Sequence, residues 1–141
     1  MGLLKDRDKK TIKKEFAKLP EPVKLIMFTQ AMECQFCHET RELMEEVAAL
    51  SDKLSVEVYD FIKDKERVLH YGIDKIPATV VEGKKDYGIR FFGIPSGYEF
   101  PSLMEAVLRV STGESGLSDK TKALVKTINT PVHIQVFATP T

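Results

Sequence analysis

One pair of cysteines constrains this chain more than any other feature of its sequence. Cys34 and Cys37 are its only two cysteines and are separated by two residues. They follow a short apolar run at 23–28 and precede a segment, 40–50, in which apolar residues recur at helical spacing. The pair is therefore expected on a strand-to-helix turn, with Cys34 at or just before the start of the helix.

A cysteine in that position is chemically activated. Unpaired backbone N–H groups and the positive end of the helix dipole favour a thiolate, and can lower a thiol pKa from about 8.5 to roughly 3.5–7.5. Because Cys34 is nearer the helix start than Cys37, it is expected to gain most from this effect. The pattern predicts dithiol–disulfide exchange in which Cys34 attacks and Cys37 resolves.

Other uses of the pair remain open. Cys34, Cys37 and His38 also spell a haem-attachment string, but covalent haem would need export and a distal axial ligand. A zinc site needs four ligands, and the remaining histidines, His70 and His133, fall on different segments. No metal and no cofactor are therefore expected. A non-catalytic adaptor or metal-binding module is the alternative to an enzyme.

Charge and hydropathy narrow the class of partner. The chain has 21 basic and 21 acidic side chains, so its charge gives no reason to expect nucleic acid as a partner. No apolar run is long enough to span a membrane. The N-terminus lacks the apolar core of a signal peptide, which predicts a cytoplasmic protein. In that compartment, a close cysteine pair is more often catalytic or metal-binding than structural.

The order of predicted elements defines an α/β domain. A strand, a helix and a second strand form a parallel unit, and a hairpin beginning after Pro77 completes a mixed four-stranded sheet flanked by helices. The predicted helices are 5–19, from the cysteines to about 50, 64–71 and about 101–110. The predicted strands are 23–28, 54–61, 78–81 and 87–92.

This order resembles the thioredoxin fold over residues 20–112. The resemblance is carried by Cys34-Gln-Phe-Cys37 on the first strand-to-helix turn, by Ile76-Pro77 some forty residues later, and by the strand–strand–helix ending. It implies that Cys34 is the nucleophile and that Cys37 is the resolving thiol. It also implies that the Ile76–Pro77 bond is cis and lies against the cysteines.

The same resemblance implies a substrate site around the cysteines. Ile76 and Pro77 would form a ledge that pairs with an incoming peptide strand, and Gly93 matches a glycine near that groove. Gln35 and Phe36, between the cysteines, are the candidate substrate-binding side chains, and Phe36 is expected to face solvent or substrate because it has no apolar stripe to join. The buried acid that the fold carries on its central strand has no match here, since Phe28 stands in its place, and Glu57 on the adjacent strand is the predicted substitute.

The C-terminal residues repeat the opening of the chain. After a domain at 1–112, a linker leads to a predicted helix at 118–128 and a strand at 132–137, which mirrors 23–28. Residues 113–141 are therefore expected to be the linker, first helix and first strand of an incomplete second unit. That strand is expected on a sheet edge beside 54–61, or paired with another copy of the chain, so self-association is predicted.

The doubling indicates a particular family. The chain resembles the N-terminal half of the two-unit, glutaredoxin-like protein disulfide oxidoreductases of thermophilic prokaryotes, and the matching segments are Met-Gly-Leu, Pro-Val-Lys-Leu-Ile, Cys-Gln-x-Cys, Pro-Ala-Thr and Phe-Gly-x-Pro-x-Gly-x-Glu-Phe. The resemblance implies reduction, formation or exchange of disulfides in protein substrates. It also implies a thioredoxin-reductase-like flavoenzyme as electron donor.

Overall fold

The computed structural model describes residues 2–139 and contains one mixed sheet. Its strand order is β2-β1-β3-β4, in which β1 and β2 are parallel while β3 is antiparallel to both β1 and β4. This confirms the predicted four-stranded sheet. The strands are β1 Val23–Thr29, β2 Leu54–Asp60, β3 Ala78–Glu82 and β4 Asp86–Phe92.

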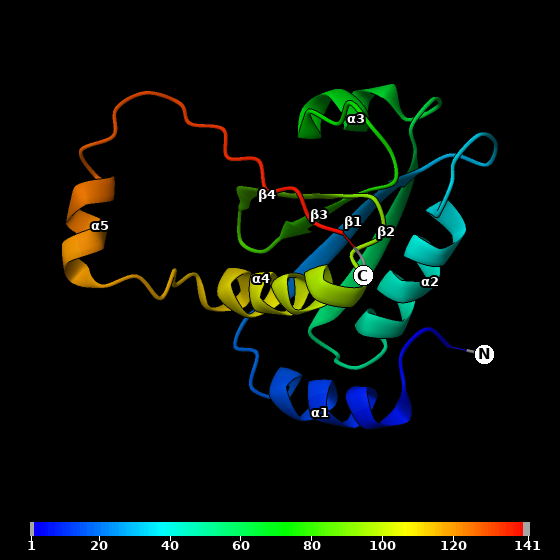
Figure 1. Ribbon diagram of the computed structural model, residues 1–141, viewed down its shortest axis with the longest axis horizontal. Coiled ribbons are helices and arrows are strands. Elements are labelled where there is room, and N and C mark those ends of the chain that lie inside the picture. The colour runs from blue at the N-terminus through cyan, green and yellow to red at the C-terminus, as the bar shows by residue number, and fades with distance from the viewer. Residues whose placement is uncertain (1, 140–141) are drawn as a thin grey trace.

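Helices cover both faces of this sheet (Figure 1). Helices α2 and α4 pack on one face together with α1, and α3 packs on the opposite face. A single 3₁₀ turn, η1, leads into α4. The helices are α1 Asp6–Phe16, α2 Cys37–Ala48, α3 Lys65–Tyr71, α4 Phe100–Thr112 and α5 Asp119–Val125, and η1 is Gly97–Glu99.

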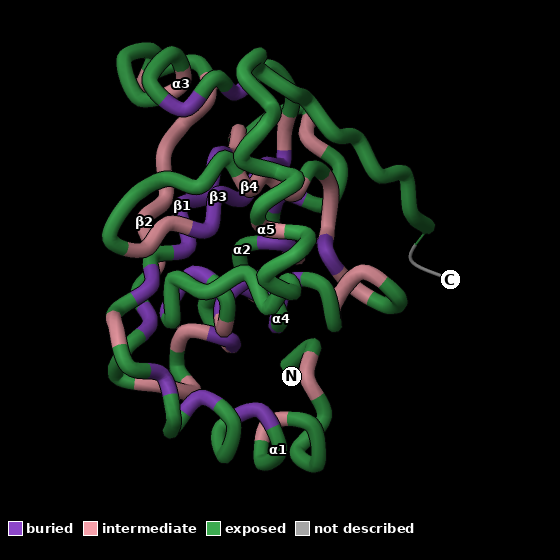
Figure 2. The backbone as a smooth tube through the Cα atoms, turned by 90° about the vertical axis from the view of Figure 1, so that its left-hand side faces the viewer, coloured by how far each residue is buried: buried purple, intermediate pink, exposed green. Residues whose placement is uncertain are grey.

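Strand β1 is the centre of the core and is buried on both sides (Figure 2). Leu25 faces the cluster under α2 and α4, whereas Ile26 and Phe28 face the cluster under α3. A strand covered on both faces reads as a continuous apolar run, which is why 23–28 was recognisable in the sequence.

Helix α1 joins the same core through a narrow stripe. Ile12 and Phe16 are buried, as their spacing predicts. No side chain caps the helix, although Asp6 and Asp8 stand at its start. Both carboxylates lie in the first turn instead, where the helix dipole still favours negative charge.

The domain closes where the end of α4 meets the segment before β1. The Ser111 hydroxyl donates a 2.6 Å hydrogen bond to the Glu21 carbonyl oxygen and accepts a 3.2 Å bond from the Glu21 N–H. Gly113, at φ +71, then ends the helix. These contacts connect residues ninety positions apart in the sequence.

Beyond this closure, the predicted second segment is only partly present. Helix α5 forms within 118–128, and the Ser118 hydroxyl accepts the Thr121 N–H at its start. The predicted strand at 132–137 is wrong: these residues have no regular secondary structure and are exposed, and β2 remains an edge of the described sheet. An isolated strand leaves its backbone groups unpaired, so an alternating pattern alone does not make one. Residues 140–141, which the same prediction included, lie outside the described residues.

Candidate active site

The two cysteines form a disulfide at the end of the sheet where β1 finishes. Their Cα atoms are 5.6 Å apart. Helix α2 begins at Cys37, so Cys34 lies three residues before the helix rather than at its start. Because its sulfur is bonded to the first residue of α2, that sulfur still lies at the N-terminal end of the helix, where the dipole favours a thiolate.

The turn between the cysteines is stabilised by hydrogen bonds from a residue of α2. Phe36 adopts a left-handed conformation, with φ 65° and ψ 7°. Its carbonyl oxygen accepts hydrogen bonds from both the backbone N–H and the hydroxyl of Thr40, at 2.9 and 2.6 Å. Since Thr40 is fully buried, this pair of hydrogen bonds fixes the turn to the core.

The two sulfurs differ in exposure. Cys34 is half-buried, whereas Cys37 is only 4% exposed. An attacking thiol must reach a bulky partner, but a resolving thiol has only to reach its neighbour. The exposure therefore distinguishes the two positions in the direction that the sequence predicts.

The predicted ledge lies at the same end of the sheet. The Ile76–Pro77 peptide bond is cis. Residue 78, which comes directly after it, pairs with Phe28 near the end of β1, and the Gly93 N–H donates a 2.8 Å hydrogen bond to the Pro77 carbonyl oxygen. Register thus brings Pro77 and Gly93 together, at the sheet end from which the chain leads into Cys34.

Apolar side chains are exposed around this end of the sheet. Phe36 is 46% exposed, Met32 is more so, and Phe92 at the end of β4 is 37% exposed. Phe92 is not covered because it is the last residue of β4, which is an edge strand. The Lys75 ammonium lies 4.2 Å from the centre of the Phe92 ring. No periodic pattern in the sequence marks Lys75 or Phe92 as belonging to this end of the sheet.

Glu57 does not replace the missing buried acid. Its carboxylate accepts hydrogen bonds from the Lys24 ammonium and the Tyr59 hydroxyl, both at 2.9 Å. The Lys24 hydrogen bond, followed by that of Tyr59, holds the pKa of Glu57 below its usual range. These partners keep the Glu57 carboxylate ionised, in a structural ion pair with Lys24. The position on the central strand where the fold carries its buried acid is occupied here by the fully buried Phe28.

The described part of the chain offers no competing site of the kinds left open. Residues 2–139 contain no group of three or more histidine, cysteine, aspartate or glutamate residues that could hold a metal ion. None of the described helices is long and apolar enough to cross a membrane. The disulfide and its surroundings remain the chemically distinctive feature of this region.

Comparisons with known proteins agree with this geometry. The thioredoxin domain family matches residues 24–105. A probable thioredoxin from Methanothermobacter marburgensis is 33% identical over 86 residues, which cover 60% of this chain and 92% of that protein. An NADH dehydrogenase from Bacillus subtilis is 30% identical over 95 residues, covering 67% of this chain but 16% of that protein.

Two solved structures are similar over most of the chain. A protein disulfide oxidoreductase from Aeropyrum pernix superposes with a TM-score of 0.77 at 26% identity, covering 86% of this chain and 54% of that one. The NTD_N/C domain of alkylhydroperoxide reductase AhpF from Enterococcus faecalis gives the same TM-score at 30% identity, covering 85% and 58%. The chain thus spans little more than half of each of these structures.

The chain belongs to the thioredoxin domain family. The Cys34–Cys37 disulfide lies within the residues that the family model matches, and proteins named as a probable thioredoxin and as a protein disulfide oxidoreductase are among those similar to this chain.

Proposed function

We propose that the chain exchanges disulfides with protein substrates, using Cys34 as the attacking thiol and Cys37 as the resolving thiol. In the reducing direction, the Cys34 thiolate attacks one sulfur of a substrate disulfide and releases the other as a thiolate. The Cys37 thiolate then attacks Cys34 and releases the second substrate sulfur. Two electrons and the two thiol protons pass to the substrate, and the Cys34–Cys37 disulfide remains.

The difference in exposure carries this assignment. Cys37 is buried to 4% exposure, so an external disulfide cannot approach it without displacing the turn, whereas Cys34 is half-buried at the surface. The Cys34 sulfur lies at the start of α2, which favours its ionised form. Exposure and electrostatics therefore favour the same residue.

A substrate segment would lie along the ledge beside the disulfide. Ile76, Pro77 and Gly93 supply backbone at this end of the sheet, while Phe36 and its neighbour Gln35 project from the turn as exposed side chains. An extended peptide can pair with such backbone, and an apolar side chain next to its cysteine can pack on Phe36. This favours protein substrates over small thiols.

The electron donor is proposed from the relatives. One is named as an NADH dehydrogenase and another, from Xanthomonas campestris, as part of an alkyl hydroperoxide reductase, and this chain matches 16% and 12% of their lengths. We propose that a thioredoxin-reductase-like flavoenzyme reduces the Cys34–Cys37 disulfide. We also propose that the protein acts in the cytoplasm. A non-catalytic adaptor or metal-binding module is less favoured, because the cysteines are joined to each other and the described residues contain no metal cluster.

Trapping of mixed disulfides tests the assignment. Cys37→Ser is expected to accumulate protein adducts at Cys34 on exposure to an oxidised protein substrate, and Cys34→Ser is expected to accumulate none. The double substitution is the matched control for adducts through other groups. Equal trapping by both single variants, or trapping through Cys37 alone, would show that the roles are wrong. Bound zinc in place of exchange would favour the metal-binding alternative.

A further inference from the structure

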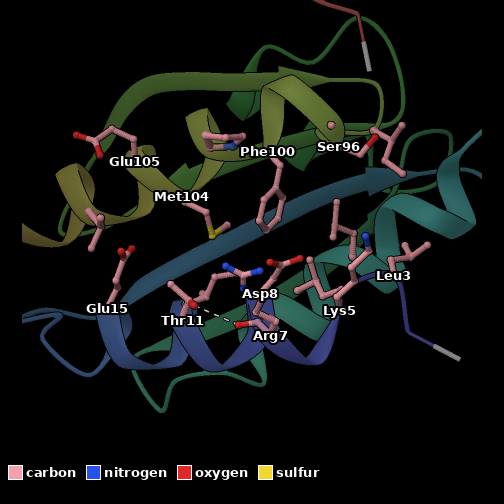
Figure 3. A pocket seen from close by; sticks show the side chains of 17 residues that line it. Leu3, Lys5, Arg7, Asp8, Thr11, Glu15, Ser96, Phe100, Met104 and Glu105 are labelled. Carbon is pink, nitrogen blue, oxygen red and sulfur yellow. Dashed lines mark hydrogen bonds between the residues drawn. The ribbon is translucent and has the colours of Figure 1, made fainter. Parts of the chain in front are cut away.

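A groove of about 940 Å³ runs between α1 and α4 (Figure 3). Its lining residues come from these two helices, from the N-terminal segment 3–5, from the segment 94–97 and, through Leu43, from α2. The larger part of its lining is apolar and comes from Leu4, Ile12, Leu43, Ile94, Phe100 and Met104, while Lys5, Arg7 and Asp8 add charged side chains toward the start of α1. A groove of this size with a mainly apolar lining on a small domain indicates a surface that another element covers.

One end of the groove carries a carboxylate on each wall. Glu15 lies on α1 and Glu105 lies on α4, and Figure 3 shows both at the same end. Glu105 is paired with Arg109 on its own helix, at 2.7 Å, but Glu15 forms no ion pair with any other described residue. An occupant is therefore expected to be apolar along its centre and basic on both sides at that end.

Helix α5 has this pattern. Its exposed apolar residues recur at helical spacing: Leu124 is 61% exposed, Val125 48% and Ile128 55%. Hydrogen bonds from the N–H groups of 126–128 to carbonyl oxygens three or four residues earlier continue the helical turn to Ile128. At 100° per residue, Lys120 falls on one flank of this stripe and Lys122 on the other. In the single copy the Lys122 ammonium lies 3.3 Å from the Glu114 carboxylate, so docking would exchange this exposed partner for one on the second copy.

The first helix of the chain shows what such a stripe does when it is covered. With Pro22 aligned to Pro131, Phe16 corresponds to Val125 and Leu19 to Ile128. Phe16 and Leu19 are 1% and 5% exposed, because α1 packs on the body of the domain. Figure 1 places α5 beyond the C-terminal end of α4, away from α1, where its own stripe stays open.

We infer that α5 of one copy docks in the groove of a second copy, forming a reciprocal homodimer. The stripe of Leu124, Val125 and Ile128 would cover the apolar interior, and Lys120 and Lys122 would face Glu15 and Glu105. Because each copy has both the helix and the groove, two equivalent contacts close the dimer with twofold symmetry. Apolar burial supplies the attraction, and the charges fix the orientation of the helix.

Sedimentation of the full chain over a range of concentrations tests the inference. The wild-type chain is expected to show a monomer–dimer equilibrium, and Leu124→Glu, a substitution on an exposed helix, is expected to shift it to monomer. The pair Lys120→Glu with Lys122→Glu should weaken the dimer by roughly tenfold or more. Lys53→Glu with Lys63→Glu, the same two charge changes at exposed positions that do not line the groove, is the matched control and should leave the dimer unchanged.

A charge exchange identifies the surface. Glu15→Lys with Glu105→Lys should weaken the dimer alone, and should restore it when combined with the two α5 reversals. A wild-type chain that stays monomeric, a dimer indifferent to Leu124→Glu, or a failure of the exchange to restore it would each overturn the inference. So would a monomer in which α5 folds into its own groove, seen as protected α5 amides without association. Trapping at Cys34 tests the proposed function separately, because no α5 residue belongs to the disulfide site.

Discussion

The backbone N–H of Gly93 donates a 2.8 Å hydrogen bond to the carbonyl oxygen of Pro77, and so fixes the end of β4 to the cis-proline turn. Gly93 has φ +84, and a Cβ built on it would meet no atom within 4 Å. A side chain at position 93 is disfavoured by the backbone conformation rather than by a steric clash. The hydrogen bond joins two positions that the sequence assigned to one substrate site.

Gly93→Ala is therefore expected to lower the free energy of unfolding by about 1–2 kcal/mol, the cost of a left-handed conformation for a residue with a Cβ. Urea unfolding measures this loss. Gly93→Asn is the comparison, because asparagine tolerates the conformation better, and its loss should be smaller. Equal losses for both variants would indicate a packing effect instead.

Phe36 also has a positive φ, of 65°, but carries a large side chain that is nearly half exposed. Phe36→Asn should stabilise the oxidised protein by up to about 1 kcal/mol, because asparagine reaches this conformation at lower cost. Thermal unfolding of the oxidised form is the measurement. Gln35→Asn, at a neighbouring position without positive φ, should give no gain, and a gain there as well would refute the explanation.

Thr79 in β3 is fully buried, and its hydroxyl has no hydrogen-bond partner among residues 2–139. Thr79→Val keeps the shape and removes a buried polar group, so it should raise the free energy of unfolding by about 1 kcal/mol or more. Thr40→Val is the opposite case, because the Thr40 hydroxyl donates to Phe36, and it should destabilise. Denaturant unfolding of the two variants should move in opposite directions.

Glu46 on α2 anchors the N-terminal segment. Burial raises the pKa of this carboxyl, but hydrogen bonds from the Leu3 and Leu4 N–H groups, together with Lys9, outweigh it and hold the pKa below 4.5. Since the folded pKa is lowered, this contribution to stability is complete above the unfolded value of 4.5 and is lost as the pH falls through the folded pKa.

Hydrogen exchange of the Leu3 and Leu4 amides should therefore show protection at neutral pH that disappears below about pH 4.5. Glu46→Gln should reduce the protection at neutral pH and remove most of its pH dependence. Glu45→Gln is the control, since the Glu45 carboxylate pairs with the exposed Arg41 on the same helix and not with the N-terminal segment that the structure describes. Protection that is unchanged in Glu46→Gln would mean that the carboxylate does not hold the segment.

Removal of residues 113–141 should leave the domain intact. The apolar side chains of α5 and of the segment after it are exposed, so deletion should change the free energy of unfolding of the monomer by no more than about 0.5 kcal/mol. Thiol reactivity of the reduced protein should not change. Phe16→Ala, in the buried counterpart of α5, should cost about 3–5 kcal/mol. A truncation as damaging as Phe16→Ala would show that the tail packs on the domain.

The domain was predictable because local signals and tertiary structure agree in it. A short apolar run predicted the central strand, and Pro77 predicted the start of β3. The cysteine spacing and the Ile-Pro element placed the candidate site. Each of these signals reflects a constraint within a few residues of the chain.

The incorrect predictions concern features that depend on tertiary contacts, which the sequence alone does not reveal. The alternation at 132–137 is compatible with a strand, but a strand also needs a neighbour, and no described strand pairs with it. Phe92 looks like a core residue until its place at the end of an edge strand is known. The start of α2 shifted to Cys37 because Phe36 turns left-handed, which nothing in a phenylalanine indicates.

The Ser111 hydroxyl completes the fold before the last thirty residues begin. By bonding to both backbone groups of Glu21, it ties the exit of the domain to its entrance, so the sheet does not depend on the residues beyond α4. Such a unit can be carried whole inside proteins of very different length, which agrees with its match to 92% of one relative and 16% of another. Ser111 thus marks the boundary at which this domain can be fused to different domains without a change in its own fold.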